Sequence, residues 1–255
     1  MPATVASAID LDIDDGVYYP SSDGKPMAET PDHARCMVLL FQALEDYFRD
    51  QPAMYVAMNM NWYWEKGNRK ACRGPDVMLI PGVEQKKTRN SFRSWNESGL
   101  VPAVCFEMAS KKTWKKNLGE VKDDYESHGV KEYFLFDPQF QFLDTPLIGF
   151  RLHRGRYVAI PYEGDGSLIS RQLGLRALPA GLLLRLYDLK TGELILIKDE
   201  RIEQERQRAE QERQRAEQER QRAERAESRA DQLAVEVDRL RRMLAESGTA
   251  PNGAH

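Results

Sequence analysis

The chain lacks the features that membrane insertion, secretion or a structural zinc site would require. No stretch approaches the roughly 20 consecutive apolar residues of a membrane span, and the N-terminus lacks the basic-then-apolar pattern of a signal sequence. The 3 cysteines are widely spaced, match no zinc-binding pattern and favour a reducing compartment. We therefore expect a cytoplasmic protein.

An excess of positive charge is also missing. The 255 residues carry a formal net charge of -3. Residues 199–255 contain 12 arginines and 14 acidic residues, which leaves 25 basic and 26 acidic residues for 1–198. Because neither part is globally basic, any contact with nucleic acid must come from a local patch.

The apolar residues predict an α+β fold with a mixed sheet and helices packed on it. Thr30 supplies an N-cap and Pro31 a first helical position, and the apolar residues behind them recur at helical spacing. We predict helices at 31–49 and 113–128, and strands at 55–60, 75–80, 101–110, 130–137, 150–153, 157–160 and 194–197. Residues 1–28 are polar, and we expect them to form a loosely held arm.

Two acidic residues interrupt two of the apolar predicted strands. Asp76 follows Pro75 at the start of the first, and Glu107 lies near the end of the second. A carboxylate inside an apolar strand is costly to bury unless a cation or a hydrogen-bonding partner compensates it. If the two strands pair, both carboxylates converge on one metal ion. Taken singly, each acid is better explained by a hydrogen bond or a salt bridge, for Glu107 with Lys122.

Two further segments have a composition that suits contact with nucleic acid. The predicted loop at 81–100 mixes basic with aromatic side chains, namely Lys86, Lys87, Arg89, Phe92, Arg93 and Trp95. A merely solvated loop is the equal alternative. The aromatic group at 62–64 suits base stacking, although the packed end of a strand explains it better.

The C-terminal part contains a seven-residue repeat. The sequence Glu-Gln-Glu-Arg-Gln-Arg-Ala occurs three times between 203 and 223, and no glycine or proline falls between 193 and 247. This pattern predicts a long helix. Position a of the heptad is Ile202, Ala209, Ala216, Ala223, Ala230, Val237 and Leu244, and position d is Glu205, Glu212, Glu219, Ala226, Leu233 and Leu240. The seam is apolar only from Ala226 onward, so we predict a homo-oligomer through the last heptads of a coiled coil. The alternative is a solitary charged helix.

The order of these features resembles the Uma-type restriction endonucleases of the PD-(D/E)XK nuclease superfamily. The resemblance covers residues 27–200 and leaves out the repeat. Its carriers are Glu29-Thr30, His33, the Arg-Gly-Pro-Asp-Val run at 73–77, residues 106–113, Lys122, Tyr125 and residues 129–138. The expected organisation is an arm at 1–28, a restriction-endonuclease-like domain at 29–198, a heptad helix at 199–247 and a disordered tail at 248–255.

This resemblance implies Mg²⁺- or Mn²⁺-dependent hydrolysis of DNA phosphodiester bonds. Asp76 and Glu107, with the Met108 carbonyl, would hold the ion by hard oxygen ligands. Lys122 would complete the catalytic set, with its ammonium pointing between the two acids. The family alternative is a catalytically inactive nuclease fold that acts as a DNA- or protein-binding scaffold through its coiled coil.

The chain departs from the superfamily pattern at two positions. The superfamily lysine stands two residues after the glutamate, where this chain has Ala109. Lys122, from the following helix, is therefore assigned that role, and Lys111 and Lys112 are as well suited to binding phosphate. An acid that is common near the start of this helix is replaced by Asn117.

Overall fold

The computed structural model describes residues 13–21 and 30–247. The chain divides into two compact units, residues 1–198 and 199–255. The second unit is formed by one helix, α4 (Lys198–Ser247). No helix among the described residues is both long and apolar enough to cross a bilayer. Glu29 and the predicted tail at 248–255 lie outside the described residues.

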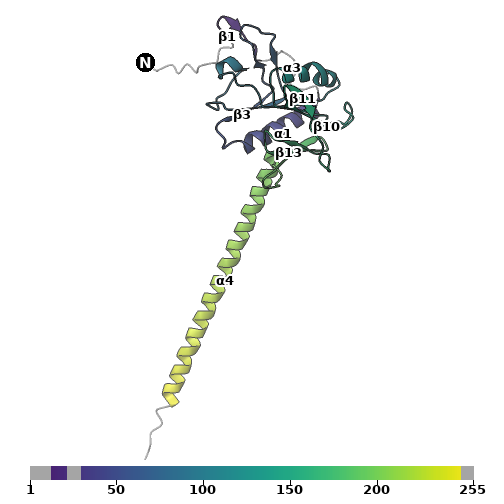
Figure 1. The fold of residues 1–255 in the computed structure, drawn as a ribbon. Coiled ribbons are helices and arrows are strands. Elements are labelled where there is room, and N and C mark those ends of the chain that lie inside the picture. Colours follow the sequence, from purple (N-terminus) through teal and green to yellow (C-terminus); the bar gives the residue numbers. More distant parts are fainter. Residues whose placement is uncertain (1–12, 22–29, 248–255) are drawn as a thin grey trace, which may run out of the picture. The chain divides into compact units, whose positions relative to one another are not determined.

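A six-stranded mixed sheet forms the centre of the first unit (Figure 1). The strands run in the order β11-β10-β9-β8-β6-β3. They are β3 (Met54–Met58), β6 (Val77–Pro81), β8 (Val104–Met108), β9 (Glu132–Phe136), β10 (Leu147–His153) and β11 (Arg156–Ala159). Strands β8 and β9 are parallel and the other neighbours are antiparallel. The predicted α+β fold with a mixed sheet is confirmed.

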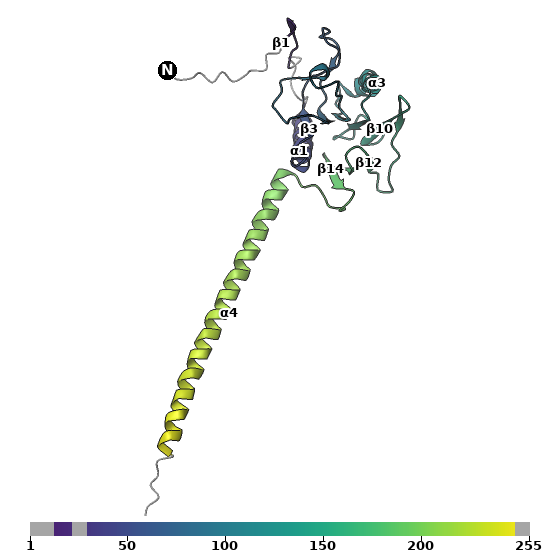
Figure 2. The same cartoon turned by 60° about the vertical axis from the view of Figure 1, so that its left-hand side comes forward.

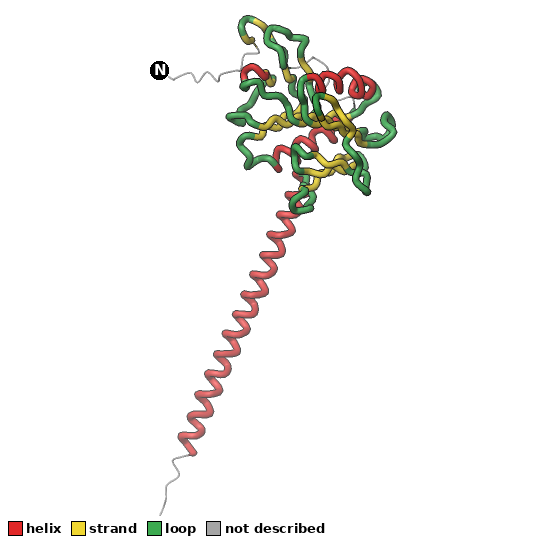
Figure 3. Tube along the Cα trace, viewed as in Figure 1, coloured by secondary structure: helices red, strands yellow, loops and turns green. Residues whose placement is uncertain are grey.

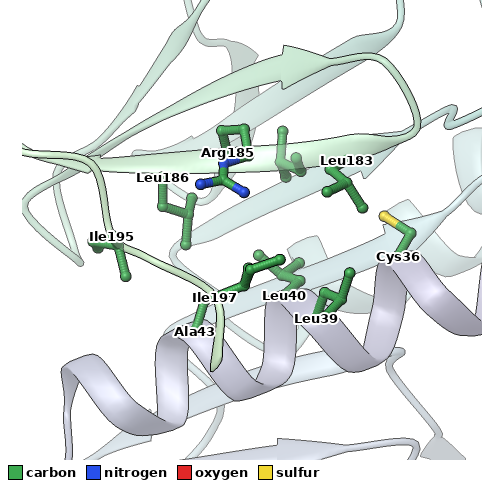
Figure 4. Close-up of a pocket in the computed structure, with 10 residues that line it drawn as sticks. Cys36, Leu39, Leu40, Ala43, Leu183, Arg185, Leu186, Ile195 and Ile197 are labelled. Carbon is green, nitrogen blue, oxygen red and sulfur yellow. The ribbon is translucent and has the colours of Figure 1, made fainter. Parts of the chain in front are cut away.

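One face of this sheet packs against helix α1 (Pro31–Tyr47). Thr30 caps the helix, because its Oγ1 accepts a hydrogen bond from the His33 backbone N–H at 3.2 Å. A second sheet of β12 (Leu168–Ser170), β13 (Leu175–Ala180) and β14 (Leu183–Asp188) contributes to the same core. Helix α1 lies beside β14 (Figure 2), where its apolar side chains face Leu183, Leu186 and Ile195 (Figure 4).

The opposite face is covered by a helical crossover between β8 and β9, so that the central sheet lies between helices (Figure 3). The crossover consists of α2 (Trp114–Lys116), a π-helical turn η2 (Asn117–Val121) and α3 (Lys122–Ser127). Trp62 and Tyr125 belong to this second core. Because strand side chains alternate, Val77 and Phe106 face α1, whereas Met78 and Cys105 face the crossover.

Short strands surround this core. They are β1 (Ile13–Asp14), β2 (Val17–Tyr18), β4 (Trp62–Tyr63), β5 (Cys72–Arg73) and β7 (Phe92–Arg93), followed by the 3₁₀ turn η1 (Ser94–Asn96). The expectation of a loosely held arm is wrong for residues 13–21. Tyr19 is fully buried, and the Pro20 carbonyl accepts hydrogen bonds from the side chains of Asn61 and Tyr63.

Two other expectations need correction. Residues 194–197 do not form a strand, since Leu194 makes one isolated bridge with Tyr187 before the chain enters α4. Strands β12 and β13 had no expectation in the sequence. Strand β12 is only three residues long, β13 contains Arg176 and Pro179, and glycines flank both strands, so neither run stands out from a loop.

The family motif at 129–138 has a structural role. Gly129 ends the crossover at φ +84°, a conformation that favours glycine. Asp137 is completely buried and accepts hydrogen bonds from four backbone N–H groups, those of Gln139, Gln141, Phe142 and Leu143. The motif therefore fixes the chain on either side of β9 rather than adding a side chain to the acidic site.

Candidate active site

Asp76 and Glu107 lie opposite each other at one end of the central sheet. In the antiparallel ladder of β6 and β8, Val77 pairs with Phe106, so the next position outward places Asp76 across from Glu107. Side chains at opposed positions of an antiparallel pair extend on the same side. Both residues are largely buried, at 8% and 9% exposure. The predicted pairing of the two acidic strands is therefore present.

Hydrogen bonds from three elements hold the two carboxylates. Asp76 Oδ2 accepts the backbone N–H of Met108 at 2.6 Å, and His33 Nε2 lies 3.3 Å from the same oxygen. Glu107 Oε1 accepts the Tyr125 hydroxyl at 2.6 Å. Helix α1, strand β8 and helix α3 thus converge on the pair. Tyr125 is a supporting residue that the sequence indicated only as part of a motif.

The electrostatic environment favours a bound cation between these acids. Burial raises the pKa of Glu107 well above its ordinary value, and the nearby Asp76 charge raises it further. The Tyr125 hydrogen bond and the charges of Arg73 and Lys116 lower the pKa of Glu107, but they do not cancel the first two effects. A divalent cation would offset both the burial cost and the mutual repulsion of the carboxylates.

The donor set fits a hard divalent ion with few protein ligands. Among residues 13–21 and 30–247, no group of three or more His, Cys, Asp and Glu side chains is arranged to hold a metal. Zinc sites use three or four such side chains. Mg²⁺ commonly binds through one or two carboxylates and keeps several waters. The Asp76–Glu107 pair matches that second pattern.

Lys122 does not point into the cleft, so the predicted position of its ammonium is wrong. Lys122 Nζ lies over the ring of Phe150 on β10, 5.1 Å from the ring centroid. Val121 and Tyr125 form the buried face of the crossover, and Lys122 is one residue beyond Val121. One residue corresponds to a rotation of about 100° around a helix, which directs Lys122 along the sheet toward β10.

The cations whose charges act on Glu107 are instead Arg73 and Lys116. Arg73 lies at the end of β5, three residues before Asp76. Lys116 lies at the end of α2 and is exposed. Lys111 and Lys112 are exposed in the turn after β8. Arg73 was predicted only as part of the motif at 73–77 and without a role of its own, although its closeness to Asp76 along the chain was a usable signal.

Several basic and aromatic side chains of the loop at 81–100 make contacts within the protein, so the loop is not merely solvated. Lys86 Nζ donates to the Phe48 carbonyl at 2.6 Å, at the end of α1. Arg89 is buried, bonds Glu97 at 2.8 Å and lies over the ring of Tyr55. Phe92 and Arg93 are also buried and Trp95 donates a hydrogen bond to Asp14, whereas Lys87 is exposed.

The aromatic group at 62–64 is likewise part of the packing. Trp62 and Tyr63 are at most 1% exposed, so neither ring is available for base stacking. Trp62 Nε1 donates to Ser94 Oγ at 2.8 Å. The packed end of a strand is therefore the correct interpretation of these two residues.

Fold and site together define an α+β protein in which two buried carboxylates lie opposite each other at one end of two central strands of a mixed sheet. The chain belongs to the Uma2 family, described as "Putative restriction endonuclease", whose family model matches residues 10–183. A crystal structure titled as a putative nuclease belonging to DUF820 from Anabaena variabilis ATCC 29413 is similar, with 17% sequence identity and a TM-score of 0.42. That match covers 58% of this chain and 76% of the other. No curated protein matches the chain.

Proposed function

We propose that this protein is a metal-dependent endonuclease that hydrolyses DNA phosphodiester bonds at the Asp76–Glu107 cleft. The observation that carries the proposal is the opposed, buried pair of carboxylates in a member of a restriction-endonuclease family. Asp76 and Glu107, with the Met108 carbonyl, are the proposed ligands of Mg²⁺ or Mn²⁺. When bound, this ion would polarise the scissile phosphate and make an attacking water more acidic.

The surrounding residues orient the ligands and neutralise charge. The Met108 N–H fixes one oxygen of Asp76 and leaves the other for the ion. The Tyr125 hydroxyl likewise fixes Oε1 of Glu107 and leaves Oε2 for the ion. The charge of Lys116 acts on the same carboxylate and would offset negative charge that develops on the phosphate oxygens. The test is cleavage of plasmid, linear duplex and single-stranded DNA with Mg²⁺ or Mn²⁺ and with a chelator.

A scaffold without catalysis remains the second candidate function. The displaced Lys122 favours it, because no lysine of the predicted catalytic set approaches the acids. The outcome that would support the scaffold is DNA or protein binding with no cleavage of any DNA form under either metal.

The two crossover lysines should differ in their effect on cleavage. We expect Lys116→Met to slow cleavage by about tenfold or more, because it removes a charge that acts on Glu107. Lys122→Met should change the rate less than about threefold, since its ammonium lies over Phe150. Single-turnover rates of the two variants measure the difference. A large loss in Lys122→Met alone would restore the role first assigned to that residue.

Metal binding should strengthen as the pH rises. The pKa of Glu107 is raised by burial and by the Asp76 charge, so a metal ion would compete with a proton at this carboxylate up to a higher pH than at an ordinary glutamate. Protonated Glu107 adds to the folding stability of the metal-free protein. This contribution is fully present below about pH 4.3, the pKa of glutamate in the unfolded chain, and it is lost as the pH rises through the higher pKa of Glu107 in the folded protein. The increase in melting temperature caused by Mg²⁺ should therefore grow with pH. In Glu107→Gln this pH dependence should vanish, and its persistence would exclude Glu107 as its source.

We also propose that the chain forms a homo-oligomer through the last heptads of α4. Leu233, Val237, Leu240 and Leu244 are 46% to 71% exposed along this helix. Each buried methylene contributes only about 0.8 kcal/mol, so the alanines of the repeat add little and these four residues would dominate. The Glu/Arg repeat would then act as a stiff spacer.

Truncation after Ala226 should therefore lower the mass measured by sedimentation from that of an oligomer to that of a monomer. Val237 and Val235 provide a matched pair, because both are exposed but only Val237 occupies a seam position. Val237→Asp should dissociate the oligomer and Val235→Asp should not. Equal masses for the full-length and truncated proteins would refute this role of the seam.

A further inference from the structure

Arg73 is a cation close to the Asp76–Glu107 pair, and no catalytic role was predicted for it. It ends strand β5, three residues before Asp76, and its charge acts on Glu107. The intervening Gly74 passes close to a neighbouring side chain, since a Cβ there would lie 3.0 Å from Asn61 Oδ1. This short connection joins Arg73, at the end of β5, to Asp76, which directly precedes β6 of the central sheet.

The guanidinium group of Arg73 is incompletely satisfied. Its Nη2 contacts two carboxylates, those of Glu120 on η2 and Asp124 on α3. Nη1 donates to the Cys72 carbonyl at 3.3 Å. Nε is buried and has no hydrogen-bond partner within the part of the chain that the structure describes. Buried donors of this kind are normally paired.

The two carboxylates do not use the planar fork of the guanidinium. Arginine binds a carboxylate or phosphate best through two parallel hydrogen bonds from different nitrogens. Here both acids contact the same nitrogen, and each comes from a separate side chain. A single phosphate group could engage Nε and Nη2 together once the side chain turns, so the present contacts are replaceable.

Both acids that contact Arg73 are more exposed to solvent than Arg73 is. The Glu120 side chain is 60% exposed and the Asp124 side chain 29%, whereas Arg73 is 21% exposed. Around the cleft the acidic residues outnumber the cations Arg73 and Lys116, since Glu120 and Asp124 add to Asp76 and Glu107. This excess would repel a phosphate unless a bound cation offsets it.

We propose that Arg73 binds the scissile phosphate, and that Glu120 and Asp124 hold it in the DNA-free protein and compete with the phosphate for it. This inference rests on the proposed function, because it requires that the Asp76–Glu107 cleft takes DNA. In this proposal Arg73 contacts the substrate directly. Glu120 and Asp124 act as a latch, that is, as acids that occupy Arg73 until a phosphate replaces them. A purely structural ion pair between β5 and the crossover would give the opposite result when the acids are removed.

The test measures binding of a fluorescent DNA duplex by anisotropy, with Ca²⁺ replacing Mg²⁺ and with gels to verify that the DNA stays intact. Arg73→Met should weaken binding and make the plot of log affinity against log salt shallower by about one unit, as expected for the loss of one phosphate contact. Arg73→Lys should recover the slope but not the full affinity, because lysine lacks the fork.

The acid variants decide between the latch and a structural ion pair. Asp124→Asn combined with Glu120→Gln should raise DNA affinity by about fivefold or more, since the competitor of the phosphate is removed. Asp123→Asn is the control, because Asp123 is an exposed neighbour of Asp124 on the same helix, whereas the ion pairs of Arg73 in the described part of the chain are with Glu120 and Asp124. It should raise affinity much less than Asp124→Asn does.

Several outcomes would overturn the proposal. Lower affinity and a lower melting temperature in the double acid variant would show a structural ion pair. Equal gains from Asp123→Asn and Asp124→Asn would show unspecific charge repulsion. Unchanged binding and salt dependence in Arg73→Met, in a wild-type protein that binds and cleaves DNA, would remove Arg73 while leaving the nuclease function intact. Failure of the wild-type protein to bind any DNA would instead remove the nuclease function itself.

Discussion

Asp76→Asn is expected to reduce DNA cleavage by at least about 10²- to 10³-fold, the size of loss that follows removal of one key electrostatic group from an active site. The change removes one negative charge from the proposed metal site. It keeps the shape of the side chain and an oxygen that can accept the Met108 N–H, which now binds Asp76 Oδ2 at 2.6 Å. The fold should therefore survive while metal binding weakens.

Two measurements separate loss of metal from loss of fold. Isothermal titration with Mn²⁺ should show weaker binding in Asp76→Asn, and the unfolding midpoint of the metal-free variant should stay close to that of the wild type. Asp123→Asn makes the same chemical change on the exposed side of α3 and should leave cleavage unaltered. Full cleavage by Asp76→Asn would contradict the proposed site, whatever the behaviour of the control.

The acidic pair could be predicted because both acids stand in strands whose neighbours are apolar. Val77 and Phe106 must face a core, and that requirement fixes the side on which Asp76 and Glu107 emerge. Strand alternation has a period of two residues, so a correct pairing of the strands places both carboxylates together. The alternation of apolar residues in the sequence and the packing of the sheet therefore place the two carboxylates on the same side.

The position of Lys122 could not be obtained in the same way. Its sequence neighbours Val121 and Tyr125 bind the crossover to the sheet, and a lysine one residue from that face is carried toward Phe150. The π-helical turn at Asn117–Val121 also rotates the side chains that follow it around the helix axis, and no residue type in this segment predicts such a turn. A flexible lysine also has several possible partners, which residue spacing does not distinguish.

The basic loop illustrates a different limit. Lys86 and Arg89 have the composition of a phosphate-binding segment, but their partners are carbonyls and carboxylates from other parts of the chain. Those partners become neighbours only after the chain has folded. Composition identified the loop as charged, whereas the tertiary contacts determine that Lys86 and Arg89 bind groups within the protein.

The largest expected loss of stability comes from Glu132→Ala. Glu132 is fully buried in β9, next to the parallel partner β8, and accepts four hydrogen bonds. The donors are Arg151 Nε at 2.8 Å, Ser170 Oγ at 2.5 Å, Arg171 N at 3.0 Å and Gln172 N at 3.3 Å. These contacts join β9 to β10 and to the chain that follows β12. Glu132 is therefore a buried polar link between the central sheet and the second sheet.

Removal of the carboxylate would leave the Arg151 charge and the other donors without this partner. Breaking a buried pair in this way typically costs about 3–5 kcal/mol, against a total stability of about 5–15 kcal/mol for a domain. All 4 tryptophans lie within residues 62–114, so their fluorescence during urea unfolding reports on the first unit without interference from α4. We expect a strongly lowered midpoint, or a first unit that is already unfolded without urea.

Glu45→Ala is the matched control, because Glu45 is exposed on α1 and the same side chain is removed. Exposed substitutions of this kind usually change stability by no more than about 0.5 kcal/mol. If Glu132→Ala unfolded at the same urea concentration as Glu45→Ala, the two sheets would be held together by their shared apolar core alone. The four hydrogen bonds of Glu132 would then contribute no net stability, since water or a rearranged Arg151 would replace the carboxylate at no cost.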